Sequence, residues 1–97
     1  MLKHIVMVNF KVEVGQHEQG ELAKQVVETV RQIPGTKNVF IGEASEAGGK
    51  ARYAAALFMD FDSETTLKVY LEHPVHKAAE AQMASVFSEV FVSNYLY

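Results

Sequence analysis

The stretch Leu2–Phe10 reads Leu-Lys-His-Ile-Val-Met-Val-Asn-Phe and is apolar at nearly every position. In an extended strand, alternate side chains point to opposite faces. One face then carries His4, Val6, Val8 and Phe10, and the other carries Ile5, Met7 and Asn9. Because both faces are largely apolar, this stretch predicts a strand that is covered on both sides.

The segments that follow predict one helix and two further strands. Apolar residues recur at three- and four-residue spacing from Leu22 to Ile33, and this amphipathic pattern stops at Pro34-Gly35. Lys37–Ala44 and Arg52–Phe61 then predict two strands, joined by a glycine-containing loop into a loose hairpin.

The last third of the chain predicts a helix broken at a proline. Ser63 is a good cap for a helix that should end at His73, because a residue before proline is disfavoured in the helical region. Pro74 suits the first turn of a new helix. The expected apolar stripe of this helix is Val75, Ala79, Met83, Val86, Phe87 and Val90. Val90–Tyr97 alternates as a closing strand.

The predicted order is βαββαβ, which indicates one α+β domain over residues 1–97. Its helices should cover one side of a four-stranded antiparallel sheet and leave the other side bare. The bare side would expose an apolar patch made of Ile5, Met7, Phe40, Ala54, Ala56, Phe58, Phe91 and Tyr95. Patches of that kind mark interfaces, so we expect a homodimer packed sheet against sheet.

Composition excludes several classes of partner. The formal net charge is -3 and the basic residues are scattered, so nucleic acid is not an expected partner. No apolar run is long enough to span a bilayer and no signal peptide is recognisable, so we expect a cytoplasmic protein with no membrane partner. The chain has no cysteine, which removes thiolate chemistry and cysteine-ligated metals.

The segment Tyr70–His76, which reads Tyr-Leu-Glu-His-Pro-Val-His, concentrates the candidate chemistry. Helical phase places His76 on the stripe of Met83 and Phe87, pointing inward, and Tyr70 shares the inward face of the preceding helix. Such a pair can act as a general base with a hydroxyl donor for a carbonyl oxygen. It equally fits a buried histidine and tyrosine that satisfy each other's hydrogen bonds.

Other polar residues carry weaker signals. His4 is a polar group on an otherwise apolar strand face, where it could orient a ligand hydroxyl, and Asn94 would be its partner if the last strand lies beside the first. His73 is best interpreted as a helix cap. A metal site at His73 and His76 is not expected, because no further cluster completes a coordination sphere.

Three segments resemble the stress-responsive A/B barrel (Dabb) domain family: the opening His4–Lys11, the turn Ile33-Pro34-Gly35, and the motif Tyr70–His76. The resemblance runs nearly end to end. It implies a ferredoxin-like fold that dimerises into an α/β barrel. This agrees with the dimer predicted from the bare apolar side of the sheet.

A few plant members of that family are cyclases that fold a linear polyketide without a cofactor, in a pocket between sheet and helices. By similarity, the catalytic pair would be Tyr70 and His76. The expected ligand pocket is formed by His4, Val6, Val8, Leu22, Ala23, Val26, Val39, Phe87 and Val92. The chain departs from those cyclases after Tyr53, where alanines replace a pocket histidine, and on the first helix, where aliphatic residues replace aromatic ones.

Three functions follow from the sequence as alternatives. The first is a homodimeric protein of this family that binds a small apolar or phenolic molecule. The second is a cofactor-independent cyclase or lyase with His76 as general base and Tyr70 as oxyanion donor. The third, which rests on fold analogy alone, is a small α/β-barrel monooxygenase.

Overall fold

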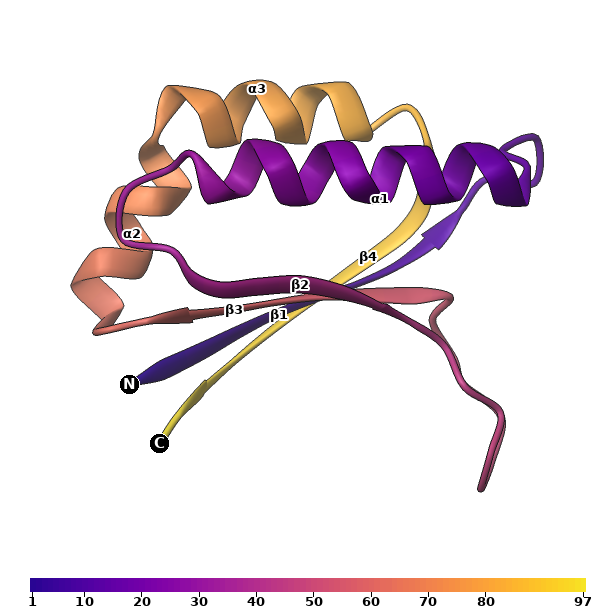
Figure 1. Ribbon diagram of the computed structural model, residues 1–97, viewed down its shortest axis with the longest axis horizontal. Coiled ribbons are helices and arrows are strands. Elements are labelled where there is room, and N and C mark those ends of the chain that lie inside the picture. Colours follow the sequence, from indigo (N-terminus) through magenta and orange to yellow (C-terminus); the bar gives the residue numbers. More distant parts are fainter.

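The computed structural model describes residues 1–97 and contains a four-stranded sheet and three helices, which all lie on one face of the sheet (Figure 1). The elements are β1 Leu2–Phe10, α1 Gln16–Arg31, β2 Lys37–Glu43, β3 Ala55–Phe61, α2 Glu64–Glu72, α3 Pro74–Met83 and β4 Phe87–Leu96. All neighbouring strands are antiparallel and their order is β2-β3-β1-β4. The predicted α+β, ferredoxin-like βαββαβ architecture is therefore confirmed. None of the helices has both the length and the apolar character needed to cross a bilayer.

The break between α2 and α3 follows the predicted chemistry. The Ser63 side chain accepts a hydrogen bond from the Thr66 amide and caps α2. His73 has extended backbone angles, φ −65° and ψ 135°, as expected before a proline. Its Nδ1 accepts from the Val75 amide at 3.1 Å, so His73 caps α3, which begins at Pro74. The prediction that His73 is a cap is confirmed.

The boundary between α3 and β4 differs from the prediction. The helix ends at Met83 rather than continuing through Val90, and β4 begins at Phe87. A register shift opposite Asn9 and Phe10 gives β4 an extra residue there, which is a β-bulge. The bulge breaks strict alternation, so Phe87 and Val90 both face the helices.

The third strand is shorter than predicted because it begins at Ala55 rather than Arg52. The Asn9 side chain holds the residues just before this strand, in addition to a backbone hydrogen bond from the Ala54 amide to the Val8 carbonyl at 3.0 Å. Its Nδ2 donates to the Arg52 carbonyl at 3.1 Å, and its Oδ1 accepts from the Ala54 amide at 2.9 Å.

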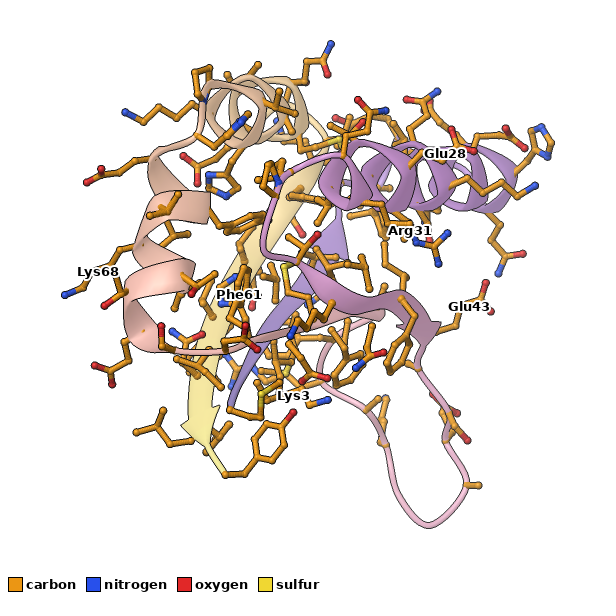
Figure 2. The ribbon with its side chains drawn as sticks, turned by 60° about the vertical axis from the view of Figure 1, so that its left-hand side comes forward. Lys3, Glu28, Arg31, Glu43, Phe61 and Lys68 are labelled. Atoms are coloured by element: carbon orange, nitrogen blue, oxygen red, sulfur yellow. The ribbon has the colours of Figure 1, made fainter.

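The hydrophobic core fills the space between the sheet and helices α1 and α2. Phe61 and Met59 of β3 are completely buried, and Figure 2 shows Phe61 beneath the helices while Lys68 of α2 points outward. The core also contains Leu2, Val30, Ile33, Val39, Leu57, Leu67 and Tyr70. Helix α3 is different, since it packs against α1 and α2 but has no buried residue of its own.

The opposite face of the sheet is apolar and uncovered. Phe40, Phe91 and Tyr95 are each half exposed or more, and the rings of Phe40 and Phe58 stack with their centroids 4.8 Å apart. This face matches the predicted patch.

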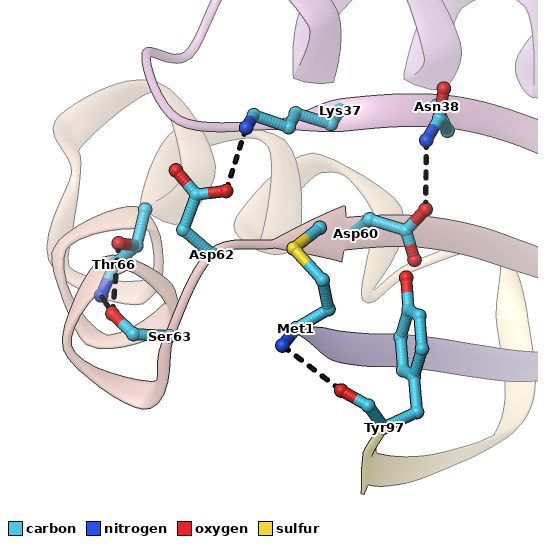
Figure 3. A network of polar contacts seen from close by, with 8 residues as sticks. All are labelled: Met1, Lys37, Asn38, Asp60, Asp62, Ser63, Thr66 and Tyr97. Atoms are coloured by element: carbon cyan, nitrogen blue, oxygen red, sulfur yellow. Dashed lines mark hydrogen bonds and ion pairs between the residues drawn. The ribbon is translucent and has the colours of Figure 1, made fainter.

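A polar cluster lies on the same uncovered face, at the end near both termini. The Lys3 ammonium is 2.8 Å from Asp60 Oδ1, and Asn38 donates to Asp60 Oδ2 at 2.9 Å. Figure 3 shows the Tyr97 hydroxyl directed at the same carboxylate. The hydrogen bond from Lys3, supported by those from Asn38 and Tyr97, lowers the pKa of Asp60 to about 2 against the opposing effect of burial. Asn38 adopts a φ of 52°, a conformation that asparagine tolerates better than most residues.

Candidate functional site

A cavity of about 430 Å³ lies between the sheet and the helices. It is lined by 22 residues, of which 18 are hydrophobic. Its floor is formed by β1 and β4, and α3 forms much of its roof. Because α3 is supported by the other helices and stands away from these strands, the space beneath it is left empty.

The floor of the cavity is polar at one end and apolar at the other. Antiparallel pairing of β1 with β4 sets four cross-strand pairs along it: His4 with Asn94, Val6 with Val92, Val8 with Val90, and Phe10 with Phe87. The two phenylalanine rings meet edge to face, with centroids 5.4 Å apart, and close the apolar end. A molecule in this cavity therefore meets hydrogen-bonding groups at the His4 end only.

Tyr70 of α2 stands over the polar end. It is only 2% exposed, and its ring packs against Phe61 and His76 with centroids 5.1 and 4.6 Å away. Its hydroxyl makes no hydrogen bond to the protein, yet it is not sealed from the cavity. Burial, and secondarily the negative charge of Glu80, raise the pKa of Tyr70 to about 12. At neutral pH this phenol is protonated and free to donate a hydrogen bond.

His76 lies in the first turns of α3, where the kink after Glu72 brings it next to Tyr70. Its Nδ1 is 3.0 Å from the Leu71 carbonyl oxygen. Because a carbonyl can only accept, Nδ1 carries a proton and neutral His76 has its lone pair on Nε2. Nε2 is 4.0 Å from a Glu80 carboxylate oxygen, and the side chain is 16% exposed. His76 and Tyr70 thus touch without satisfying each other's hydrogen bonds.

His4 completes the polar end from below. It is 3% exposed, its Nδ1 lies 2.6 Å from Asn94 Oδ1, and its ring centroid is 6.0 Å from that of Tyr70. Burial lowers the pKa of His4, an effect that the hydrogen bond to Asn94 opposes and the nearby His76 reinforces. As with His76, donation from Nδ1 leaves the Nε2 lone pair available.

Most of the residues expected around a pocket do line this cavity. They are His4, Val6, Val8, Ala23, Val26, Tyr70, His76, Phe87 and Val92. Leu22 is half-buried on α1 and does not line it. Val39 does not line it either, because it is a buried member of the core beneath α1.

Several lining residues were not predicted as part of the pocket. Asn94, Val90 and Ile41 belong to strands, and Ala79, Glu80 and Met83 belong to α3. The helical stripe of Ala79 and Met83 was visible in the sequence, but the gap between α3 and the sheet was not. His73 lies outside the cavity lining, and no group of three or more His, Cys, Asp or Glu side chains is arranged to hold a metal ion.

The polar end combines one free donor with free acceptors. The Tyr70 hydroxyl can donate to a carbonyl, phenolate or enolate oxygen, and the Nε2 atoms of His76 and His4 can accept from a hydroxyl or take a proton. Together, these groups can bind the polar head of a small molecule without help from any other residue.

Comparison with known proteins adds to this geometry. The family described as Stress responsive A/B Barrel Domain matches residues 2–96. Olivetolic acid cyclase of Cannabis sativa is 25% identical over 95 residues, which cover 97% of this chain and 94% of the cyclase.

Two solved structures show the same fold. A dimeric ferredoxin-like protein of unknown function from Thermobifida fusca is 23% identical, with a TM-score of 0.81 over 99% of this chain and 90% of its own. Hydroxynitrile lyase from Passiflora edulis is 16% identical, with a TM-score of 0.87 over 99% of this chain and 92% of its own.

Proposed function

The chain belongs to the stress-responsive A/B barrel domain family, and from that premise we propose that it is a homodimeric protein whose cavity binds a small apolar or phenolic molecule. The observation that carries this proposal is the empty space of about 430 Å³ with free hydrogen-bonding groups at one end. This volume is within the usual range for small-molecule sites, which are mostly apolar with a few placed polar groups.

The polar end favours a ligand with a hydroxyl or carbonyl head. A phenol can donate to Nε2 of His76 or His4 and accept from the Tyr70 hydroxyl, so both partners are satisfied. Its apolar body would then lie along the valine pairs of the floor toward Phe10 and Phe87.

Calorimetric titration with para-alkylphenols of increasing chain length tests this proposal. Each buried methylene should add up to about 0.8 kcal/mol until the apolar end is filled. Ala79→Phe places a ring in the cavity and should abolish binding, whereas Ala78→Phe adds the same ring to the exposed side of α3 and should not. Absence of binding to the whole series, or equal effects of the two variants, would contradict the proposal.

The dimer is supported by the uncovered apolar face of the sheet. Sheet-against-sheet packing would remove Phe40, Phe91 and Tyr95 from water, and the related Thermobifida fusca structure is described as dimeric. The cavity lies on the other side of the sheet, so each protomer would keep a complete site of its own.

A second candidate function is a cofactor-independent lyase or cyclase. In that reaction His76 Nε2 would remove a proton α to a carbonyl, and the Tyr70 hydroxyl would stabilise the enolate oxygen. The free lone pair, the free hydroxyl and the 4.6 Å between the rings support it. So do the names of two relatives, a cyclase and a hydroxynitrile lyase.

Exchange of α-protons in deuterated water separates binding from catalysis. With para-pentylacetophenone as the probe, an enzyme should accelerate exchange at the methyl group, because His76 returns a deuteron to the enolate carbon. His76→Ala should abolish the acceleration, and His17→Ala, which removes an exposed histidine of α1 outside the cavity, should retain it. If the ketone binds but its α-protons exchange no faster than in free solution, the enzymatic function would be rejected and the binding function retained.

A further inference from the structure

The charges around the cavity are unevenly distributed. No lysine or arginine lines it, and its only acidic residue is Glu80 of α3. The Glu80 side chain is 74% exposed, and its carboxylate is 4.0 Å from His76 Nε2. A negative charge therefore stands beside the polar end, with no permanent positive charge to balance it.

The remaining polar groups of the cavity do not supply that balance. Tyr70 is protonated at neutral pH, and Asn94 is uncharged. Burial disfavours the charged form of His4. His76 is the other histidine of the lining, and its Nδ1 proton is already directed to the Leu71 carbonyl. If Nε2 also carried a proton, the positive charge would lie 4.0 Å from the Glu80 carboxylate. It would then pair with Glu80 rather than with the charge of a ligand anion.

Glu80 also lies at the opening of the cavity, where an entering ligand would pass it. Most of the exposed lining residues lie on α3 or β4, among them Glu80, Val90 and Val92, so the cavity opens between these two elements. An anion moving inward would lose water, approach a carboxylate and find no cation at the end of its path. Burying an unpaired charge in this way is strongly unfavourable.

We propose that the cavity selects neutral ligands over anions of the same shape, and that Glu80 is a specificity-determining residue for this selection. The inference rests on the proposed ligand-binding function and narrows it. It assigns to the cavity phenols, ketones, aldehydes and amides, and excludes carboxylates and phosphates whose charged group would have to reach the polar end.

Calorimetric titration with para-pentylbenzamide and para-pentylbenzoate near neutral pH tests the selection, because the two molecules have nearly the same shape and differ in charge. Wild type should bind the amide at least about tenfold more tightly. Glu80→Gln should reduce that ratio by about fivefold, as expected for one nearby charge in a partly solvated site. Glu72→Gln removes the same charge from an exposed position on α2 outside the cavity and should leave the ratio unchanged.

The outcomes separate this inference from the function on which it rests. Equal or tighter binding of the benzoate would overturn the selection and leave ligand binding intact. A preference for the amide that Glu80→Gln does not alter would overturn the role of Glu80. Failure of the amide and of the alkylphenols to bind at all would overturn the proposed function itself.

Discussion

Replacing Tyr70 by phenylalanine separates a structural role of its hydroxyl from a ligand-binding role. Removal of a hydroxyl that is bonded within a protein usually costs about 0.5 to 1.5 kcal/mol of stability. The Tyr70 hydroxyl has no partner in the protein, and a phenylalanine ring keeps the contacts with Phe61 and His76. We therefore expect the free energy of unfolding of Tyr70→Phe to stay the same or to rise by up to about 1 kcal/mol. Affinity for para-alkylphenols should fall about threefold to tenfold through loss of one hydrogen bond.

Alkaline pH gives a second measurement of the same substitution. The pKa of Tyr70 rises from 10.0 to about 12 on folding, so its stabilising effect is complete below pH 10 and is lost as the pH rises toward 12. Between neutral pH and about pH 11, wild type should lose about 1.4 kcal/mol relative to Tyr70→Phe. Urea unfolding followed by circular dichroism measures both quantities. A loss of more than about 1 kcal/mol in Tyr70→Phe at neutral pH, with ligand affinity unchanged, would refute a free hydroxyl directed at a ligand.

Three other predictions concern the rest of the fold. Because burial lowers the pKa of His4, wild type should lose stability as the pH falls below 6.5, the unfolded value, and His4→Leu should lose less in the same urea titrations. Gly35→Ala should cost about 1 to 3 kcal/mol of stability, because φ is 94° and the new Cβ would lie 2.7 Å from a Thr66 methyl group. Gly20→Ala in α1 meets no atom within 4 Å and should stabilise the protein by about 0.5 to 1 kcal/mol. Equal melting temperatures of the two variants would contradict this prediction. Phe40→Lys should give a monomer in light scattering at micromolar concentration, while Val69→Lys, an equally exposed position on α2, should leave a dimer; a monomeric wild type would reject the interface.

The parts of the fold that were predictable are those where local chemistry and tertiary contacts agree. The alternation of β1 and the position of Pro74 each allowed one solution, and both are found in the structure. Residues 86–90 were not so constrained, because a short apolar run fits a helical stripe and a strand equally well. The pairing of Phe87 with Phe10, which lies near the opposite end of the chain, decided the outcome in favour of a strand.

The candidate site shows the same division. Tyr70 and His76 point inward as helical phase predicts, and His4 reaches Asn94 because β4 lies beside β1. The size of the cavity depends on how far α3 stands from the sheet, which is set by its packing against α1 and α2. No pattern within α3 encodes that distance, so Glu80 could be placed on a helix by sequence but not at the opening of a cavity.

Helix α3 has no buried residue, so the core of the domain is incomplete beneath this helix. The apolar side of the helix, with Ala79 and Met83, faces space rather than side chains. Segments with so few buried contacts open locally at low free-energy cost, so amide hydrogens of α3 should exchange faster than those of α1. A bound molecule would supply the contacts that the chain itself omits. Its binding should then slow exchange most in α3, and the ligand would act as the last element of the domain to fold.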